Sequence, residues 1–298
     1  MAQDTVPERA RVFDRKLLRE RRRRAAPNLG AHDFLLSEVG ERLVDRLADV
    51  TRHFPLALDL GCRDGLLART LAGRGGIETL LQCDLSQSGA LGARRHGPAF
   101  VADEELLPVR SECLDAILSN LSLHWVNDLP GALAQIRDAL KPDGLFLASM
   151  FGAGTLGELR TCLMEAELAE SGGVSPRVSP FAGLRDAAGL LQRAGFALPV
   201  ADSDTITVTY PDLFRLLADL RGMGETNLLL DRLKHPTRRA IFARAAALYH
   251  ERFADADGRL RVTFQILFLT GWAPHESQQQ PAKRGSGKTS LRDVLGGS

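Results

Sequence analysis

The sequence predicts an α/β domain in which parallel strands alternate with helices. Short apolar runs recur along the first half of the chain, and stretches with helical periodicity separate them. Strands that alternate with helical segments of this length are typical of a parallel sheet with helices on both faces. The chain has 298 residues, which suffices for one large domain or for a domain with a substantial insertion.

The expected strands are apolar runs bounded by turn residues. They cover residues 56–60, 79–83, 99–102, 114–119, 145–150, 206–210 and 262–269. The helices expected between them cover residues 66–71, 86–95, 130–140, 155–169 and 184–194. The domains that follow from this pattern are an N-terminal helical segment over residues 1–52, a main domain over residues 53–272 with a helical insertion at about 211–257, and a flexible polar tail over residues 273–298.

The composition argues against several classes of function. A net charge of +1 gives no overall field that would attract nucleic acid, so no nucleic-acid partner is expected. No apolar run approaches the roughly 18 residues of a membrane-spanning helix, which leaves peripheral association with a membrane complex as an option. The four cysteines are scattered without Cys-x-x-Cys spacing and therefore predict reduced thiols, an intracellular protein and no metal site.

A run of four arginines, residues 21–24, lies within the N-terminal helical pattern. The apolar residues that recur near it at helical spacing are Val12, Phe13, Leu17 and Leu18. We interpret the run as the solvated face of an amphipathic helix. A docking surface for an acidic partner is the alternative.

The most informative motif ends the first expected strand, where Asp59 and Gly61 are followed by Gly65. This pattern differs from the Gly-x-Gly-x-x-Gly pattern of dinucleotide-binding domains. Glycine lets a ligand approach the backbone, and open α/β sheets bind ligands at the carboxyl ends of their strands. Asp59 is expected to hold the amino group of a methionine moiety that lies against Cys62 and Arg63. A helix cap is the plainer interpretation of Asp59.

Acids also follow the second and third expected strands. Asp84, which precedes Leu85, is placed to accept hydrogen bonds from both ribose hydroxyls. Asp103 is placed to accept from an adenine amino group, with the backbone of Glu104 alongside. Either acid alone could cap a helix or lie in a loop. Because acids follow three successive strands, the series predicts a pocket for S-adenosylmethionine.

Five further residues are expected near this pocket. Ser119, Asn120 and Leu121 end the fourth strand and are expected to pass under the ligand. His124 and Trp125 follow at the expected pocket mouth. Trp125 is interpreted as a core anchor or a ligand wall. His124 is a candidate catalytic base, and the catalytic residues are otherwise unknown.

The segment from Val101 to Pro130 resembles the class I methyltransferases, including the malonyl-carrier-protein methyltransferase of biotin synthesis. A closer resemblance, to the complex I assembly factor family that hydroxylates an arginine, runs from about Val12 to Gly287. It is carried by LSLHWVNDLP, LKPDG, MFGAGTLGELR, GGVSPRVSPF, LQRAGF, LRGMGETN and HESQ. The resemblance implies a Rossmann-like, seven-stranded methyltransferase sheet with N-terminal helices and a C-terminal helical insertion. It also implies a protein substrate, namely a subunit of complex I, the respiratory NADH dehydrogenase.

One residue departs from the methyltransferase pattern, because Arg63 stands where the family carries glycine. If this position has a positive φ, Arg63 is strained by roughly 1 kcal/mol or more. With an ordinary φ, Arg63 could instead pair with the carboxylate of the ligand. In both cases S-adenosylmethionine is expected to bind, but weakly.

Three functions fit these features. Methyl transfer is the first, because it needs an aligned acceptor and a dry pocket rather than a dedicated base. Arginine hydroxylation rests on the resemblance, since oxygen chemistry normally uses a metal or a flavin and no local His-x-Asp/Glu pair is present. The third is a ligand-gated assembly scaffold, in which residues 222–224 clasp a partner or simply end a helix. The expected location is the cytoplasm of a bacterium, or the mitochondrial matrix if the source is eukaryotic.

Overall fold

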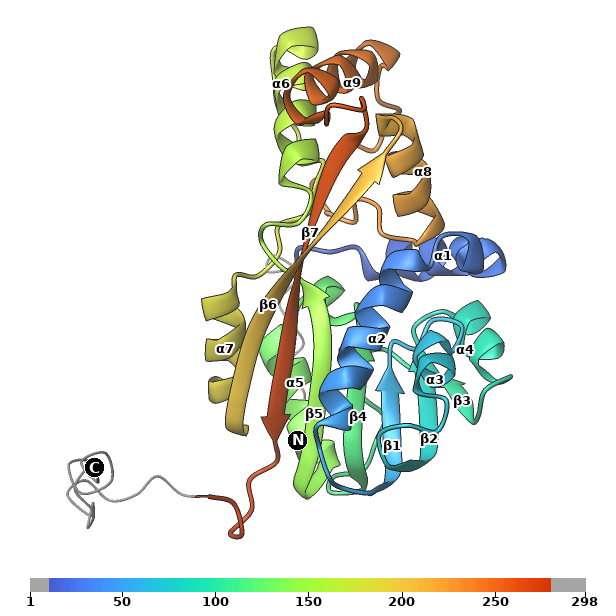
Figure 1. Cartoon of the computed structure of the whole chain (residues 1–298), viewed down its shortest axis with the longest axis vertical. Helices are drawn as coiled ribbons and strands as arrows, with labels where there is room; N and C mark the ends of the chain where they lie inside the picture. The colour runs from blue at the N-terminus through green and yellow to red at the C-terminus, as the bar shows by residue number, and fades with distance from the viewer. Residues whose placement is uncertain (1–10, 280–298) are drawn as a thin grey trace, which may run out of the picture.

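The computed structural model describes residues 11–279, which form a seven-stranded sheet with helices on both faces (Figure 1). The strands are β1 (Phe54–Leu60), β2 (Ile77–Asp84), β3 (Ala99–Val101), β4 (Leu114–Asn120), β5 (Leu140–Phe151), β6 (Ala197–Tyr210) and β7 (Leu260–Trp272). Their order in the sheet is β3-β2-β1-β4-β5-β7-β6. Strands β1 to β5 pair in parallel, and β7 is antiparallel to both of its neighbours. The expected seven-stranded α/β sheet is confirmed.

The helices fill the connections between these strands and precede the first of them. They are α1 (Arg15–Ala25), α2 (Phe34–Ala48), α3 (Leu66–Leu71), α4 (Gln87–Ala93), α5 (Leu129–Ala139), α6 (Gly157–Ser171), α7 (Leu184–Arg193), α8 (Leu213–Gly222) and α9 (Arg239–Phe253), with short 3-10 turns η2 (Ala26–Ala31) and η3 (Leu123–Trp125). The buried stripe of α2 packs with α3 and one sheet face. Buried residues of α5 and α7 pack in a second core with strand residues.

β1 marks the point where the strand order reverses. β1 pairs with β2 on one side and with β4 on the other. The connections that leave the two strands therefore diverge, and this opens a crevice at the carboxyl ends of the strands. Figure 1 shows α1 beside this end of β1.

β6 is longer than the apolar run that predicted it, because it begins at Ala197 rather than at residue 206. Exposed and partly buried residues alternate along it, as expected for an edge strand with one solvated face. Its first half, ALPVADSD, contains Pro199 and ends in three polar residues, so it was not recognised as a strand. The expected strand at residues 262–269 is likewise the central part of β7.

The upper ends of β6 and β7 carry a helical lobe formed by α6, α8 and α9 (Figure 1). The expected insertion at residues 211–257 contains α8 and α9, and the segment between them, residues 223–238, is not helical. The domain boundaries stay a prediction, and residues 280–298 of the expected tail lie outside the described part of the chain.

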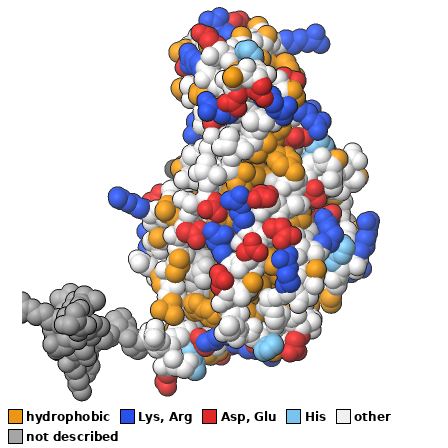
Figure 2. All heavy atoms as spheres, in the orientation of Figure 1, with side chains coloured by type: hydrophobic (Ala, Val, Ile, Leu, Met, Phe, Trp, Pro, Cys, Tyr) orange, Lys and Arg blue, Asp and Glu red, His pale blue; other side chains and the backbone are white. Residues whose placement is uncertain are grey.

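Acidic and basic side chains are interspersed over the face shown in Figure 2. Within residues 11–279, no helix combines the length and the apolarity that a bilayer crossing requires.

Candidate functional site

Asp59 lies near the carboxyl end of β1 and is 1% exposed. Neither oxygen of its carboxylate has a hydrogen-bond partner among the described residues. Burial and the nearby charge of Asp84 raise the pKa of Asp59 to about 8. A buried carboxylate without a partner is costly. Asp59 is therefore suited to receive a cationic group, and it does not act as a helix cap.

The loop after β1 needs glycine at two positions. Gly61 has φ of +82°, and a Cβ atom there would lie 2.1 Å from Oγ of Ser122. Gly65 has φ of +86°, and a Cβ atom there would lie 2.8 Å from the ring of His96. Both positions therefore exclude a side chain for steric reasons as well as for backbone conformation.

Arg63 adopts the strained alternative, with φ of +55°. Its buried side chain forms an ion pair with Glu225. Burial and the charge of Arg22 lower the pKa of Arg63, although Glu225 opposes this, and an arginine keeps its charge at neutral pH. The strain of about 1 kcal/mol therefore accompanies a buried ion pair that the glycine of the methyltransferase pattern could not form.

Asp84 ends β2 and is 1% exposed. Its carboxylate accepts hydrogen bonds from the backbone N–H of Ser86 at 2.7 Å and from that of Arg63 at 3.2 Å. Burial raises its pKa. The next residue, Leu85, belongs to a small buried cluster that also contains Leu18 of α1. Asp84 thus shapes the loop after β1, and it also faces the side chain of Arg22.

Glu104 contributes more than the backbone that the sequence analysis assigned to it. Its carboxylate is buried and accepts a hydrogen bond of 2.7 Å from Oγ of Ser122. Burial opposes its ionisation, but Arg22 and Arg15 hold the pKa of Glu104 well below its usual range. Asp103 is partly exposed and pairs with Arg15. These acids therefore lie together at the carboxyl ends of β1, β2 and β3.

Arg22 corrects the interpretation of the basic run. It is 3% exposed, and its Nη1 lies 2.7 Å from Oε1 of Glu104 and 3.2 Å from Oδ2 of Asp84. The interpretation as a solvated face is wrong for Arg22, while Arg23 and Arg24 are exposed and pair with Glu20. Residues four apart share a helix face. The position of Arg22 one turn after the buried Leu18 was the signal that could have identified it.

The residues at the end of β4 hold the crevice together. Ser119 donates to the backbone carbonyl of Leu60 at 2.8 Å and so ties β4 to β1. Asn120 donates to the carbonyl of Leu36 at 2.9 Å. Leu121 has φ of +47°, and its backbone carbonyl lies 3.4 Å from Nη2 of Arg63. These contacts position the neighbouring loops.

Glu225, between α8 and α9, is a functional candidate that the sequence analysis missed. Besides Arg63, it accepts a hydrogen bond of 2.7 Å from Nε1 of Trp125 and contacts Nε2 of His124 at 3.1 Å. Burial opposes ionisation, but Arg63 and His124 hold the pKa of Glu225 at about 2. Burial lowers the pKa of His124, which is therefore neutral at physiological pH. The signal for Glu225 was its place in LRGMGETN, one of the segments that carry the family resemblance, in which only residues 222–224 were interpreted, as a clasp or a helix end.

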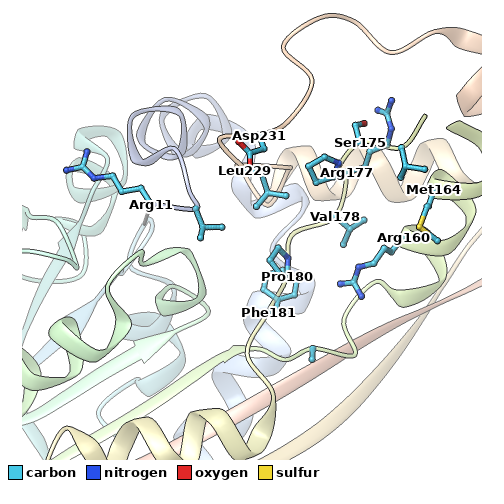
Figure 3. Close-up of a pocket in the computed structure, with 14 residues that line it drawn as sticks. Arg11, Arg160, Met164, Ser175, Arg177, Val178, Pro180, Phe181, Leu229 and Asp231 are labelled. Atoms are coloured by element: carbon cyan, nitrogen blue, oxygen red, sulfur yellow. The ribbon is translucent and has the colours of Figure 1, made fainter. Parts of the chain in front are cut away.

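Two cavities open beside Glu225 and the helical lobe. The first has a volume of about 550 Å³ and is lined by Glu225, Trp125 and apolar residues of α6 and α8. The second has a volume of about 760 Å³. Figure 3 shows Arg160 and Met164 projecting from α6 into the second cavity, opposite the segment with Pro180 and Phe181. Both cavities share lining residues in this segment, so together they form an extended groove.

The chemistry of the crevice fits S-adenosylmethionine, but its present shape leaves no room for the ligand. The unpartnered carboxylate of Asp59 suits an amino group, and Asp84 follows the neighbouring strand. The cavity that touches Asp59, Gly61 and Arg63, however, has a volume of only about 10 Å³. A space of that size holds about one water molecule. Side chains must therefore move before a ligand can enter.

Between residues 11 and 279, no group of three or more His, Cys, Asp or Glu side chains is arranged to hold a metal ion. His275, next to Glu276, is exposed and contacts Ser277.

Comparison with known proteins places this geometry in context. A family model described as "Methyltransferase domain" matches residues 58–148, the region from the end of β1 into β5, and this supports S-adenosylmethionine as the ligand of the domain. The arginine-hydroxylase NDUFAF5, mitochondrial, of Danio rerio is 44% identical over 288 residues, which are 95% of this chain and 89% of that protein. A malonyl-[acyl-carrier protein] O-methyltransferase of Xylella fastidiosa is 33% identical, over 88% of this chain and 89% of that protein.

Solved structures agree on the fold. The YcgJ protein of a Bacillus species aligns with a TM-score of 0.55 at 14% identity, covering 79% of this chain and 98% of that one. At this identity the similarity shows the fold alone.

Proposed function

We propose that this chain, which belongs to the arginine-hydroxylase NDUFAF5 family, binds S-adenosylmethionine at the carboxyl ends of β1 to β3 and modifies an arginine of a protein acceptor. Its membership of the family follows from 44% identity over nearly the whole length of both proteins. The structural observation that carries the proposal is the buried, ionised Glu225, which lies between the crevice and the groove.

Three acids would hold the ligand. Asp59 would pair with its amino group, Asp84 would accept from the ribose hydroxyls, and Asp103 would accept from the adenine amino group. S-adenosylmethionine supplies an activated methyl group when bound. The other residues proposed for this pocket act indirectly, because they fix the conformation of the loops around it. Gly61 and Arg63, for example, set the conformation of the loop after β1.

Glu225 is suited to receive the guanidinium group of an acceptor arginine. Its carboxylate lines the 550 Å³ cavity and already pairs with one guanidinium, that of Arg63. Carboxylate and guanidinium groups form strong, charge-assisted hydrogen bonds of defined geometry. Trp125 lines the same cavity and fixes the orientation of the carboxylate through its N–H group.

The relatives favour hydroxylation of that arginine. Replacement of a C–H bond by C–OH takes one atom of dioxygen together with two electrons and two protons from a reductant, and the second oxygen atom leaves as water. The match to a methyltransferase domain favours methyl transfer as the second candidate, as in the more distant O-methyltransferase relatives. His124 is neutral and could accept a proton in either reaction.

The partner and the location rest on the family. The resemblance in the sequence implies a subunit of complex I as the acceptor. The hydroxylase relatives carry "mitochondrial" in their names. We therefore propose the mitochondrial matrix for a eukaryotic source and the cytoplasm for a bacterial one, with peripheral association to complex I.

Mass spectrometry of the acceptor tests this function. Cells that lack the chain would receive the wild type, Glu225→Gln or the control Glu41→Gln, which changes an exposed carboxylate. Arginine peptides of the complex I subunits would then be compared. A gain of about 16 mass units that depends on the wild type and on the control supports hydroxylation. Its loss with Glu225→Gln supports the role of Glu225 when immunoblots show that the variant accumulates to the wild-type level. A gain of about 14 units supports methyl transfer, and no gain contradicts both reactions.

A further inference from the structure

We infer that α1 is an internal plug: Arg22 occupies the ligand's place in the crevice, and S-adenosylmethionine enters by displacing it. The inference rests on the proposed function in one respect, the identity of the ligand. It adds that the empty and the loaded protein differ in the position of α1.

Arg22 uses the same groups that the ligand needs. Its Nη1 lies within 3.2 Å of both Asp84 and Glu104, and its Nη2 lies 2.8 Å from Oγ of Ser122. Asp84 is the acid expected to accept from the ribose hydroxyls. A buried guanidinium and a ribose cannot fill one space, so the two states exclude each other.

Arg15 extends the plug toward the surface. It pairs with Asp103 and Glu104, the residues expected beside the adenine. Arg15 and Arg22 are seven positions apart, about two helical turns, and therefore project from one side of α1. Together they pair with the acids at the ends of β2 and β3 while no ligand is bound.

Few apolar contacts hold α1 in place. Its buried residues are Leu18, Arg22 and Ala25. Leu18 packs in a small cluster with Leu85, Trp125 and Leu228, and Leu17 is partly buried against it. Arg22 adds its ion pairs and a hydrogen bond to Ser122. Buried ion pairs add little net stability over a well-satisfied alternative. A ligand that supplies hydroxyl and amino groups to the same acids can therefore compete with the helix.

Movement of α1 would reach the acceptor groove as well. Leu17 and Arg21 of α1 line the 550 Å³ cavity beside Glu225. Arg11 and Val12, which precede the helix, line the 760 Å³ cavity. Ligand entry therefore changes a wall that both cavities share, and the acceptor groove takes its working shape only after the ligand has bound.

Binding of S-adenosylhomocysteine by calorimetry tests the plug. Arg22→Met retains the aliphatic part of the side chain but removes the cation that pairs with Asp84 and Glu104, which penalises the empty state. We expect its affinity to be at least about tenfold higher than that of the wild type, a change of about 1.4 kcal/mol. Arg23→Met changes an exposed arginine of the same helix and should leave the affinity unchanged. Equal or weaker binding by Arg22→Met overturns the plug.

Trypsin cleavage of the wild-type chain provides a second readout, which does not depend on the folding of a variant. The helix contains Arg19 and Arg21 to Arg24, all cleavage sites once it is released. S-adenosylhomocysteine should accelerate cleavage within α1 relative to cleavage after the exposed Arg259. Unchanged or slower cleavage in α1, with ligand bound, overturns the plug alone. If neither the wild type nor Arg22→Met binds the ligand, the assignment of the ligand is wrong, and so is the proposal that this ligand displaces Arg22.

Discussion

Nε1 of Trp125 donates a hydrogen bond of 2.7 Å to the carboxylate of Glu225, one hundred positions further along the chain. This bond joins the turn after β4 to the segment that follows α8. The same carboxylate pairs with Arg63 in the loop after β1. One buried acid thus connects the crevice, the lobe and the groove, and two of its properties can be measured.

Glu225→Gln should destabilise the fold strongly. The substitution keeps the shape of the side chain but leaves the guanidinium of Arg63 buried without an anion, which costs about 3–5 kcal/mol. Urea unfolding at pH 7 measures the loss. The control Glu41→Gln removes an exposed carboxylate that pairs with Arg74, so it should cost at most about 1 kcal/mol. Equal losses of unfolding free energy in the two variants would contradict the role of Glu225 as the buried partner of Arg63.

A double-mutant cycle isolates the pair of Arg63 and Glu225. Arg63→Gly relieves the strain at φ of +55° but leaves Glu225 ionised and short of a cation. Combined with Glu225→Gln, it removes both charges, so the double variant should be more stable than the sum of the single losses predicts, by about 1–3 kcal/mol. The same urea experiment measures this coupling. Additivity within about 0.5 kcal/mol would mean that the two side chains do not interact in solution.

Asp59→Asn should stabilise the protein, and the gain should depend on pH. The pKa of Asp59 is about 8 in the folded chain, against 3.8 for an unperturbed Asp. Because this pKa is raised, wild-type stability is lost as the pH rises from about 4 to 8, where only the unfolded chain ionises at this position. The variant avoids this loss, so its free energy of unfolding should exceed that of the wild type by a few kcal/mol at pH 7 and equal it near pH 4.

Unfolding curves at several pH values provide this comparison. Asp45→Asn, which changes an exposed aspartate, is the matched control and should follow the wild type at each pH. A constant difference between Asp59→Asn and the wild type across the range would contradict the raised pKa.

The alternation of strands and helices in the sequence predicted the sheet and the acids at the carboxyl ends of its strands, because short apolar strands and their end residues are local features. Asp59, Asp84 and Asp103 lie at or just after the carboxyl ends of β1, β2 and β3, which pair side by side in the structure. The first part of β6 was missed, since an edge strand with one solvated face lacks a continuous apolar run.

The residues that close the crevice could not be predicted in the same way. Arg22 meets Glu104 across 82 positions, and Arg63 meets Glu225 across 162 positions. The sequence does not distinguish a buried arginine from a solvent-exposed one, and only the packing of α1 shows that Arg22 is buried. Helical spacing from Leu18 is the one local clue for Arg22, and nothing local marks Glu225 as buried.

The most direct test of whether the carboxyl ends of β1 to β3 form the ligand site is calorimetric titration with S-adenosylhomocysteine at pH 7.5. It compares the wild type with Asp59→Asn. Asp59 has no partner in the ligand-free protein, and its substitution should stabilise the fold, so lost binding could not be ascribed to misfolding. We predict saturable binding by the wild type and binding weaker by about tenfold or more in Asp59→Asn. No saturation of the wild type at millimolar ligand, or equal affinities for the two proteins, would contradict the account.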